Sequence, residues 1–92
     1  MHEVALAQAI LDTVLEIVDG QQPLAVRVRA GELLAVSPDS LQFCFELVAK
    51  DTSAAETQLE VEIVPGGELL IDAIELDDGW HYRPDVAESG VS

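Results

Sequence analysis

Apolar residues recur at helical spacing near the start of the chain. The stripe they form consists of Val4, Ala7, Leu11, Val14 and Val18, widened by Ile10 and Ile17. This spacing of three and four residues predicts an amphipathic helix from Glu3 to about Val18. We expect Asp19-Gly20 to end the helix, because glycine readily takes the left-handed conformation that follows a helix C-terminus.

The segment from Pro23 to about Leu33 alternates in the manner of a β-strand. The face predicted to point toward the core carries Leu24, Val26, Val28 and Ala30. The opposite face carries Arg27 and Arg29, which we expect to pair with nearby acidic side chains.

A second helix is predicted from Ser37 to about Lys50. Ser37 is a typical N-cap, since its hydroxyl can accept from a free backbone N–H of the first turn. Pro38 fits the first helical position, and Asp39 lies near the positive end of the helix dipole. The inward face is expected to be formed by Leu41, Cys44, Phe45 and Val48.

Two more strands are predicted on either side of the turn Pro65-Gly66-Gly67. The first, over residues 59–63, alternates apolar and acidic side chains as in a half-buried strand: Leu59, Val61 and Ile63 against Glu60 and Glu62. The second runs from Leu69 to Leu76. It is apolar on both faces except for Asp72 and Glu75, which is typical of a central strand.

These elements give the order α-β-α-β-β and an α+β fold, an α/β two-layer arrangement with two helices packed on a three-stranded mixed sheet. The β-α-β unit should make a right-handed crossover between parallel strands, and the last two strands an antiparallel hairpin. Residues 1–78 then form a single domain. Residues 79–92 are predicted to be a C-terminal tail that is disordered beyond Pro84.

The composition limits the classes of partner. The chain has 92 residues, 49% of them hydrophobic, so it can fold around one small core. It carries 18 Asp and Glu against 4 Lys and Arg, a formal charge of −14, which disfavours nucleic acid and anionic membrane and favours a metal cation or a basic protein surface. A solvated surface that keeps a small protein soluble explains most of the acids. No apolar run spans a bilayer and no basic secretory start is present, which indicates a cytoplasmic protein.

The first three residues are a candidate metal site. The α-amine of Met1, the deprotonated backbone nitrogen of His2 and the His2 Nδ1 atom can close fused chelate rings, with Glu3 completing the set. Nitrogen-rich, square-planar sets suit Ni(II) or Cu(II) better than Zn(II). Because an α-amine titrates near ~7.7–8.0, the site should form above neutrality. A chain end with no ligand role is the alternative interpretation.

Other candidates are open to simpler interpretations. The single cysteine, Cys44, excludes an internal disulfide and a multi-cysteine zinc site, and a buried thiol explains it most simply. His81 is a second candidate metal ligand. Alternatively, Trp80-His81-Tyr82 covers the exposed end or face of the last strand, or Trp80 and Tyr82 contact a partner protein. No catalytic constellation is visible, so an enzyme is not predicted.

Several segments together resemble the HypA family of nickel-delivery proteins. M-H-E-V-A-L resembles the family's M-H-E-x-[SA]-[LI] start, and V-R-A-G-E-L resembles its I-G-E-L strand end. V-S-P-D-S-L-Q-F-C-F-E is similar to its V-x-P-x-x-L-x-F-x-F-E helix, while L-E-V-E-I-V-P-G and E-L-L-I-D-A-I-E-L are similar to its later strands. These segments follow the family order over residues 1–77.

The resemblance implies that His2 is a nickel ligand, with the Met1 amine and Glu3 beside it. It further implies a metallochaperone for nickel–iron hydrogenase maturation that binds Ni(II) transiently. The implied partner is a hydrogenase large-subunit precursor, a nickel-handling GTPase, or both. An adaptor or regulatory module that keeps the fold but carries no nickel is the alternative. A homodimer through an open strand edge stays an open question.

The sequence departs from the family at one place. Members carry a zinc domain with paired C-x-x-C motifs between the last two strands, where this chain has only Pro65-Gly66-Gly67. We therefore expect a domain without the structural zinc site and without bound zinc. The departure puts in doubt whatever the zinc domain contributes to partner docking and dimerisation.

Overall fold

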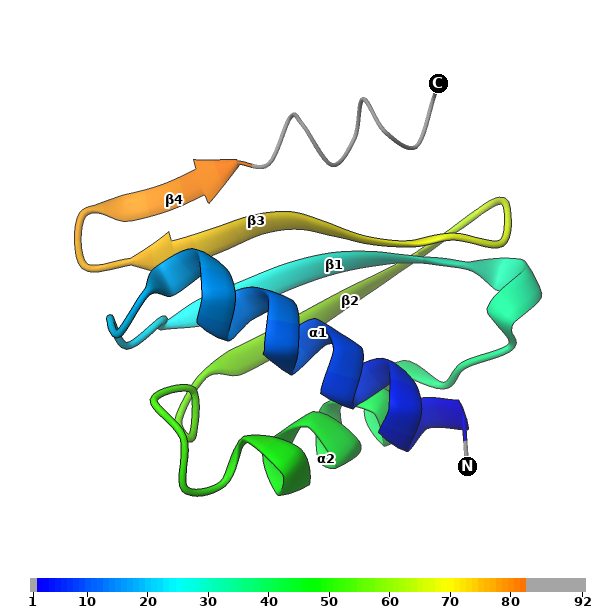
Figure 1. Ribbon diagram of the computed structural model, residues 1–92. Helices are drawn as coiled ribbons and strands as arrows, with labels where there is room; N and C mark the ends of the chain where they lie inside the picture. Colours follow the sequence, from blue (N-terminus) through cyan, green and yellow to red (C-terminus); the bar gives the residue numbers. More distant parts are fainter. Residues whose placement is uncertain (1, 83–92) are drawn as a thin grey trace.

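The computed structural model describes residues 2–82, which form two layers (Figure 1). In chain order the elements are α1 (His2–Val18), β1 (Ala25–Gly31), the 3₁₀ helix η1 (Glu32–Leu34), α2 (Pro38–Ala49), β2 (Gln58–Val64), β3 (Leu69–Leu76) and β4 (Gly79–Tyr82). Both α-helices lie on one face of a mixed sheet (Figure 1). The α+β class predicted from the sequence is therefore confirmed. Neither described α-helix is long and apolar enough to cross a membrane.

The order of the strands corrects the predicted topology. The sheet runs β2-β1-β3-β4, with β1 parallel to β2 and antiparallel to β3. The parallel pair confirms that β1, α2 and β2 form a β-α-β unit. The predicted hairpin of β2 and β3 is wrong, because β1 lies between these two strands.

The sheet has four strands rather than the predicted three. Residues 79–82, expected in the tail, form β4 and pair antiparallel with β3. Four residues are too few to show a period in the sequence, which is why the pattern did not reveal this strand. β3 lies between β1 and β4, as expected of a central strand, although the helices cover only one of its faces (Figure 1). The predicted disorder beyond Pro84 lies outside the described residues.

The turn between β2 and β3 crosses the end of β1 instead of reversing the chain. The Gly31 N–H donates to the Glu68 carbonyl at 2.8 Å, and the Leu33 N–H donates to the Gly66 carbonyl at 2.9 Å. A Cβ atom on Gly31 would overlap the Gly66 carbonyl group, so only glycine fits beneath the turn. Gly66 has a φ of 110°, which also favours glycine.

One core lies between the helices and the sheet. Its largest fully buried side chains are Phe45, Ile10, Leu41, Ile74, Val14, Val18, Val26 and Val28. The predicted stripe of α1 is confirmed except at Val4 and Ile17, which are exposed, and Leu24 is exposed before β1 begins. On α2, Cys44 and Val48 are half-buried and pack against the core as predicted.

Charged side chains are paired across the helix-free face of the sheet. Arg27 lies opposite Glu60 and Arg29 opposite Glu62 in the β1–β2 register. The Arg27 Nε atom is 3.2 Å from Glu60 Oε1, and the Arg29 Nε atom is 3.6 Å from Glu62 Oε1. Both arginines therefore pair with acids, as predicted.

We expect Gly31→Ala to destabilise the protein by about 1–3 kcal/mol, the usual cost of forcing atoms into a filled site. The added methyl group would displace the turn that the Gly31 and Leu33 N–H groups hold in place. Gly67→Ala is the matched control, because its Cβ would meet only the Leu33 side chain, at 3.8 Å. Denaturant unfolding measures both variants. Equal stability of the two would contradict the tight crossing.

Candidate metal centre

The predicted metal site lies at the first turn of α1, which begins at His2. The buried stripe of this helix packs against α2 and the sheet, so the backbone from His2 onward is held against the core. Met1 lies outside the described residues, and only the backbone of His2 is described. Of the three predicted ligands, Glu3 is therefore the one whose side chain can be placed.

The Glu3 carboxylate is engaged by backbone N–H groups from the start of both α-helices. Hydrogen bonds from its own N–H and from the Ser37 N–H hold the pKa of Glu3 below its ordinary value of 4.5, although partial burial opposes this shift. The first N–H groups of a helix have no helical acceptor, so a carboxylate there satisfies them. The Ser37 N–H therefore lies close enough to the Glu3 carboxylate to lower its pKa.

Ser37 is the residue of this site that the sequence did not reveal. Its predicted role as the N-cap of α2 is confirmed, since the Ser37 Oγ atom accepts from the Ser40 N–H at 3.4 Å. Its contact with Glu3 depends on how α1 packs beside α2, and no local pattern encodes that packing. The only signal in the sequence was that both residues begin a predicted helix.

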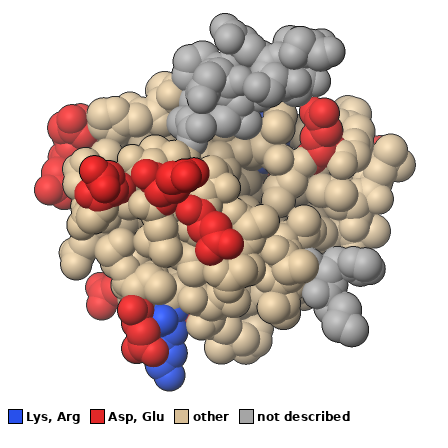
Figure 2. Space-filling model, viewed as in Figure 1, with Lys and Arg blue, Asp and Glu red and all other residues tan. Residues whose placement is uncertain are grey.

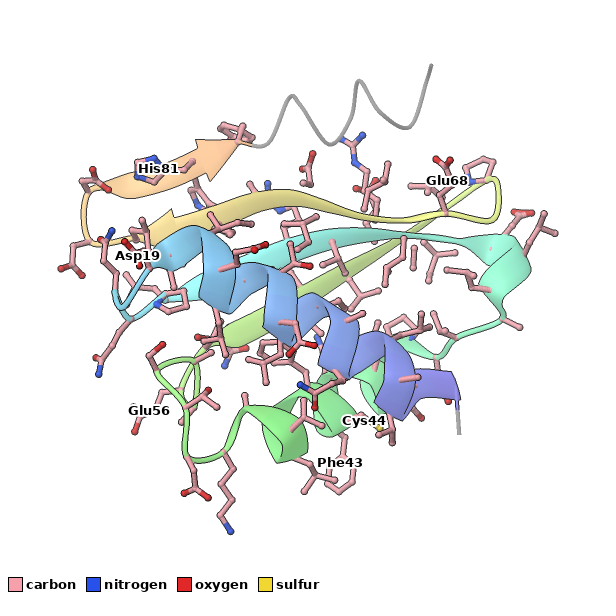
Figure 3. All side chains as sticks on the ribbon, in the orientation of Figure 1. Asp19, Phe43, Cys44, Glu56, Glu68 and His81 are labelled. Carbon is pink, nitrogen blue, oxygen red and sulfur yellow. The ribbon has the colours of Figure 1, made fainter. Side chains whose placement is uncertain are left out.

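The other two candidate ligands lie on separate elements, Cys44 on α2 and His81 on β4 (Figure 3). Cys44 packs against the core, which fits the interpretation of a buried thiol. The His81 Nε2 atom is 2.7 Å from Asp78 Oδ1, so His81 already has a local partner. Among the side chains that the structure describes, no three from His, Cys, Asp and Glu gather into a metal site.

The Trp80-His81-Tyr82 segment makes up the last three residues of β4. In its register with β3, Trp80 lies opposite Glu75 and Tyr82 opposite Ala73, whose side chain is fully buried. The Arg27 guanidinium lies 4.5 Å from the centre of the Trp80 ring, a cation–π contact. The two aromatic residues therefore cover part of β3. A partner contact at Trp80 and Tyr82 stays a prediction.

The electrostatic surroundings favour a cation. On the face seen in Figure 2, acidic side chains outnumber basic ones, in keeping with the formal charge of −14. The positive end of the α1 dipole opposes a metal ion at the helix start, and the Glu3 carboxylate offsets that effect locally. The charge of the chain is therefore compatible with a cation at this end of α1.

The chain matches a known protein family over most of its length. A family model described as "HypA: Hydrogenase/urease nickel incorporation, metallochaperone, hypA" matches residues 1–69. That description defines a metallochaperone, which carries a metal ion rather than catalysing a reaction. The chain belongs to the HypA family, and the resemblance noted in its motifs is confirmed.

Similar proteins named Hydrogenase maturation factor HypA come from several organisms. The relative from Archaeoglobus fulgidus is 42% identical over 66 residues, which cover 68% of this chain and 60% of the relative. The relative from Desulfatibacillum aliphaticivorans is 42% identical over 69 residues, which cover 71% of this chain and 53% of the relative. The relative from Methanopyrus kandleri is 38% identical over a match that covers 72% of this chain and 49% of the relative. The chain thus spans about half to three-fifths of the length of these relatives.

We expect His81→Ala to raise the pKa of Asp78 toward its ordinary value of 3.8, because the contact with His81 lowers that pKa in the folded protein. The His81–Asp78 pair therefore stabilises the folded protein at pH values above the ordinary pKa of Asp78. This stabilisation is lost as the pH falls through the lowered pKa of Asp78 in the folded protein. Carbon-13 NMR titration of the Asp78 carboxyl group measures the effect, with His2→Ala as the control. An unchanged Asp78 pKa in His81→Ala would contradict the pairing.

Proposed function

We propose that this protein binds Ni(II) through Met1, His2 and Glu3 and hands it to a partner during maturation of a nickel enzyme. The observation that carries the proposal is that α1 begins at His2. Membership of a nickel-incorporation family supports nickel as the metal.

The start of a helix suits a ligand set that includes a backbone nitrogen. The first four N–H groups of an α-helix have no hydrogen-bond acceptor within the helix. Since His2 is the first residue of α1, its amide can lose a proton to the metal without breaking a helical hydrogen bond. The Met1 amine and the His2 Nδ1 atom then close the two chelate rings, a nitrogen-rich set that suits Ni(II).

Glu3 supplies a fixed negative charge next to these nitrogen atoms. Its lowered pKa keeps the carboxylate ionised near neutral pH. A cation at the helix start is then stabilised against the positive end of the dipole. In this proposal the Glu3 carboxylate either coordinates the nickel ion or lies beside it and offsets the positive end of the helix dipole.

Delivery requires that the metal leave as readily as it arrives. A site built at one helix end, rather than enclosed in the core, stays accessible to an accepting protein. We propose a hydrogenase large-subunit precursor, a nickel-handling GTPase, or both as the acceptor, in the cytoplasm. The absence of a zinc domain at the turn of residues 65–67 is part of the same proposal, with no zinc bound by this chain.

Nickel titration by calorimetry should show about one site per chain when the Met1 amine is free. His2→Ala should abolish binding, because it removes the imidazole, and acetylation of the Met1 amine should abolish it by removing a nitrogen ligand. His81→Ala is the matched control and should bind normally, since His81 lies on β4. Binding that survives both N-terminal changes would exclude this site. A wild-type chain that binds no nickel would favour an adaptor that carries none.

The affinity for nickel should rise steeply between about pH 6 and pH 8, where the histidine and α-amine lose their protons. Binding should release protons from the amine and the His2 amide, because metal ligands must be deprotonated. Calorimetry in buffers with different ionisation enthalpies counts the released protons. An affinity that does not change with pH over this range would contradict a site made of these nitrogen atoms.

A further inference from the structure

We propose that the open edge of β2 binds an extended segment of a basic partner protein by strand addition. β2 lies at one side of the sheet and pairs with β1 alone (Figure 1). An edge strand presents unpaired backbone groups, and pairing with a peptide is a common way for proteins to use them. This surface is separate from the proposed nickel site.

The ladder identifies which backbone groups of β2 are open. The Gln58 N–H donates toward β1, to the Leu24 carbonyl at 3.0 Å. Because backbone groups alternate in direction along a strand, Glu60 and Glu62 also bond to β1. The N–H and C=O groups of Val61 and Ile63 therefore face away from the sheet.

One end of this edge is already occupied. The Gln42 side-chain amide, from α2, donates to the Leu59 carbonyl at 2.8 Å. The open stretch thus begins after Leu59 and consists of Val61 and Ile63. An added strand could form backbone hydrogen bonds with both of these residues.

The side chains along this stretch have a clear pattern. Glu60 and Glu62 lie on the helix-free face, and their side chains remain 49% and 58% exposed despite their pairing with arginines. On the other face Ile63 is 43% exposed, although it is apolar. The edge therefore offers an acidic row on one face and an apolar row on the other.

The chain itself shows which sequence pairs with this pattern. On the closed side of β2, β1 places Arg27 and Arg29 opposite Glu60 and Glu62 and a valine, Val28, opposite Val61. A partner strand on the open side would meet the same side chains. The complementary segment therefore alternates basic and apolar residues, as β1 does.

Charge disfavours a second copy of this chain as the occupant. Two β2 strands pairing antiparallel about Val61 would place Glu60 of each chain opposite Glu62 of the other, and like charges directly opposite are destabilising. The formal charge of −14 adds repulsion between whole chains. A basic strand would instead be attracted to Glu60 and Glu62 and to the negative charge of the whole chain.

The test uses the full chain and the peptide acetyl-Thr-Arg-Val-Arg-Val-Thr-amide, labelled for fluorescence anisotropy. The same peptide with glutamate in place of arginine should bind at least about tenfold more weakly, because two cross-strand pairs become repulsive. Amide hydrogen exchange should slow at Val61 and Ile63 when the arginine peptide binds. It should not change at Glu60 and Glu62, whose N–H groups already bond to β1.

Two variants of Ile63 provide the matched comparison. Ile63→Pro removes an N–H from the open side without touching the β1 ladder, a placement that edge strands tolerate, so it should abolish peptide binding. Ile63→Thr keeps the N–H at the same exposed position and should retain binding. Three results would each overturn the proposal: no binding at millimolar peptide, protection at β4 instead of β2, or a chain dimer that Ile63→Pro dissociates.

Discussion

Burial of one stripe of α1 holds the amino-terminal end of this protein in place. Each fully buried Val, Leu or Ile contributes roughly 1.5–3 kcal/mol, so lifting the helix from the core is costly. Ile10, Leu11 and Val14 are nearly or completely inaccessible to solvent. Since α1 begins at His2, the same burial positions the backbone that the proposed nickel site uses.

The starts of the two α-helices lie near one carboxylate, that of Glu3. The backbone N–H groups of Glu3 and of Ser37, the N-cap of α2, lower the pKa of the Glu3 carboxyl group. A cation placed there would otherwise face two positive helix ends, so an acid between them makes the location suitable for a metal. The surplus of negative charge over the whole chain acts in the same direction.

Local sequence patterns were sufficient for the helices, the first three strands and the fold class. The spacing of α1 and the Ser37 cap of α2 carry their signals within a few residues. The predicted β2–β3 hairpin failed because a short glycine turn can either reverse a chain or cross a neighbouring strand. Here the absence of a side chain at Gly31 permits the crossing. The contact between Glu3 and Ser37 depends on helix packing, which a single sequence does not report.

The proposed function depends on nickel binding to nitrogen atoms at the start of α1. X-ray absorption at the nickel edge of the loaded wild-type protein tests it most directly. We expect a first shell of nitrogen and oxygen only, with the outer-shell scattering of one imidazole that disappears in His2→Ala. A sulfur scatterer, which would point to Cys44 or a methionine thioether, or an imidazole signal that survives His2→Ala would exclude nickel binding at this site.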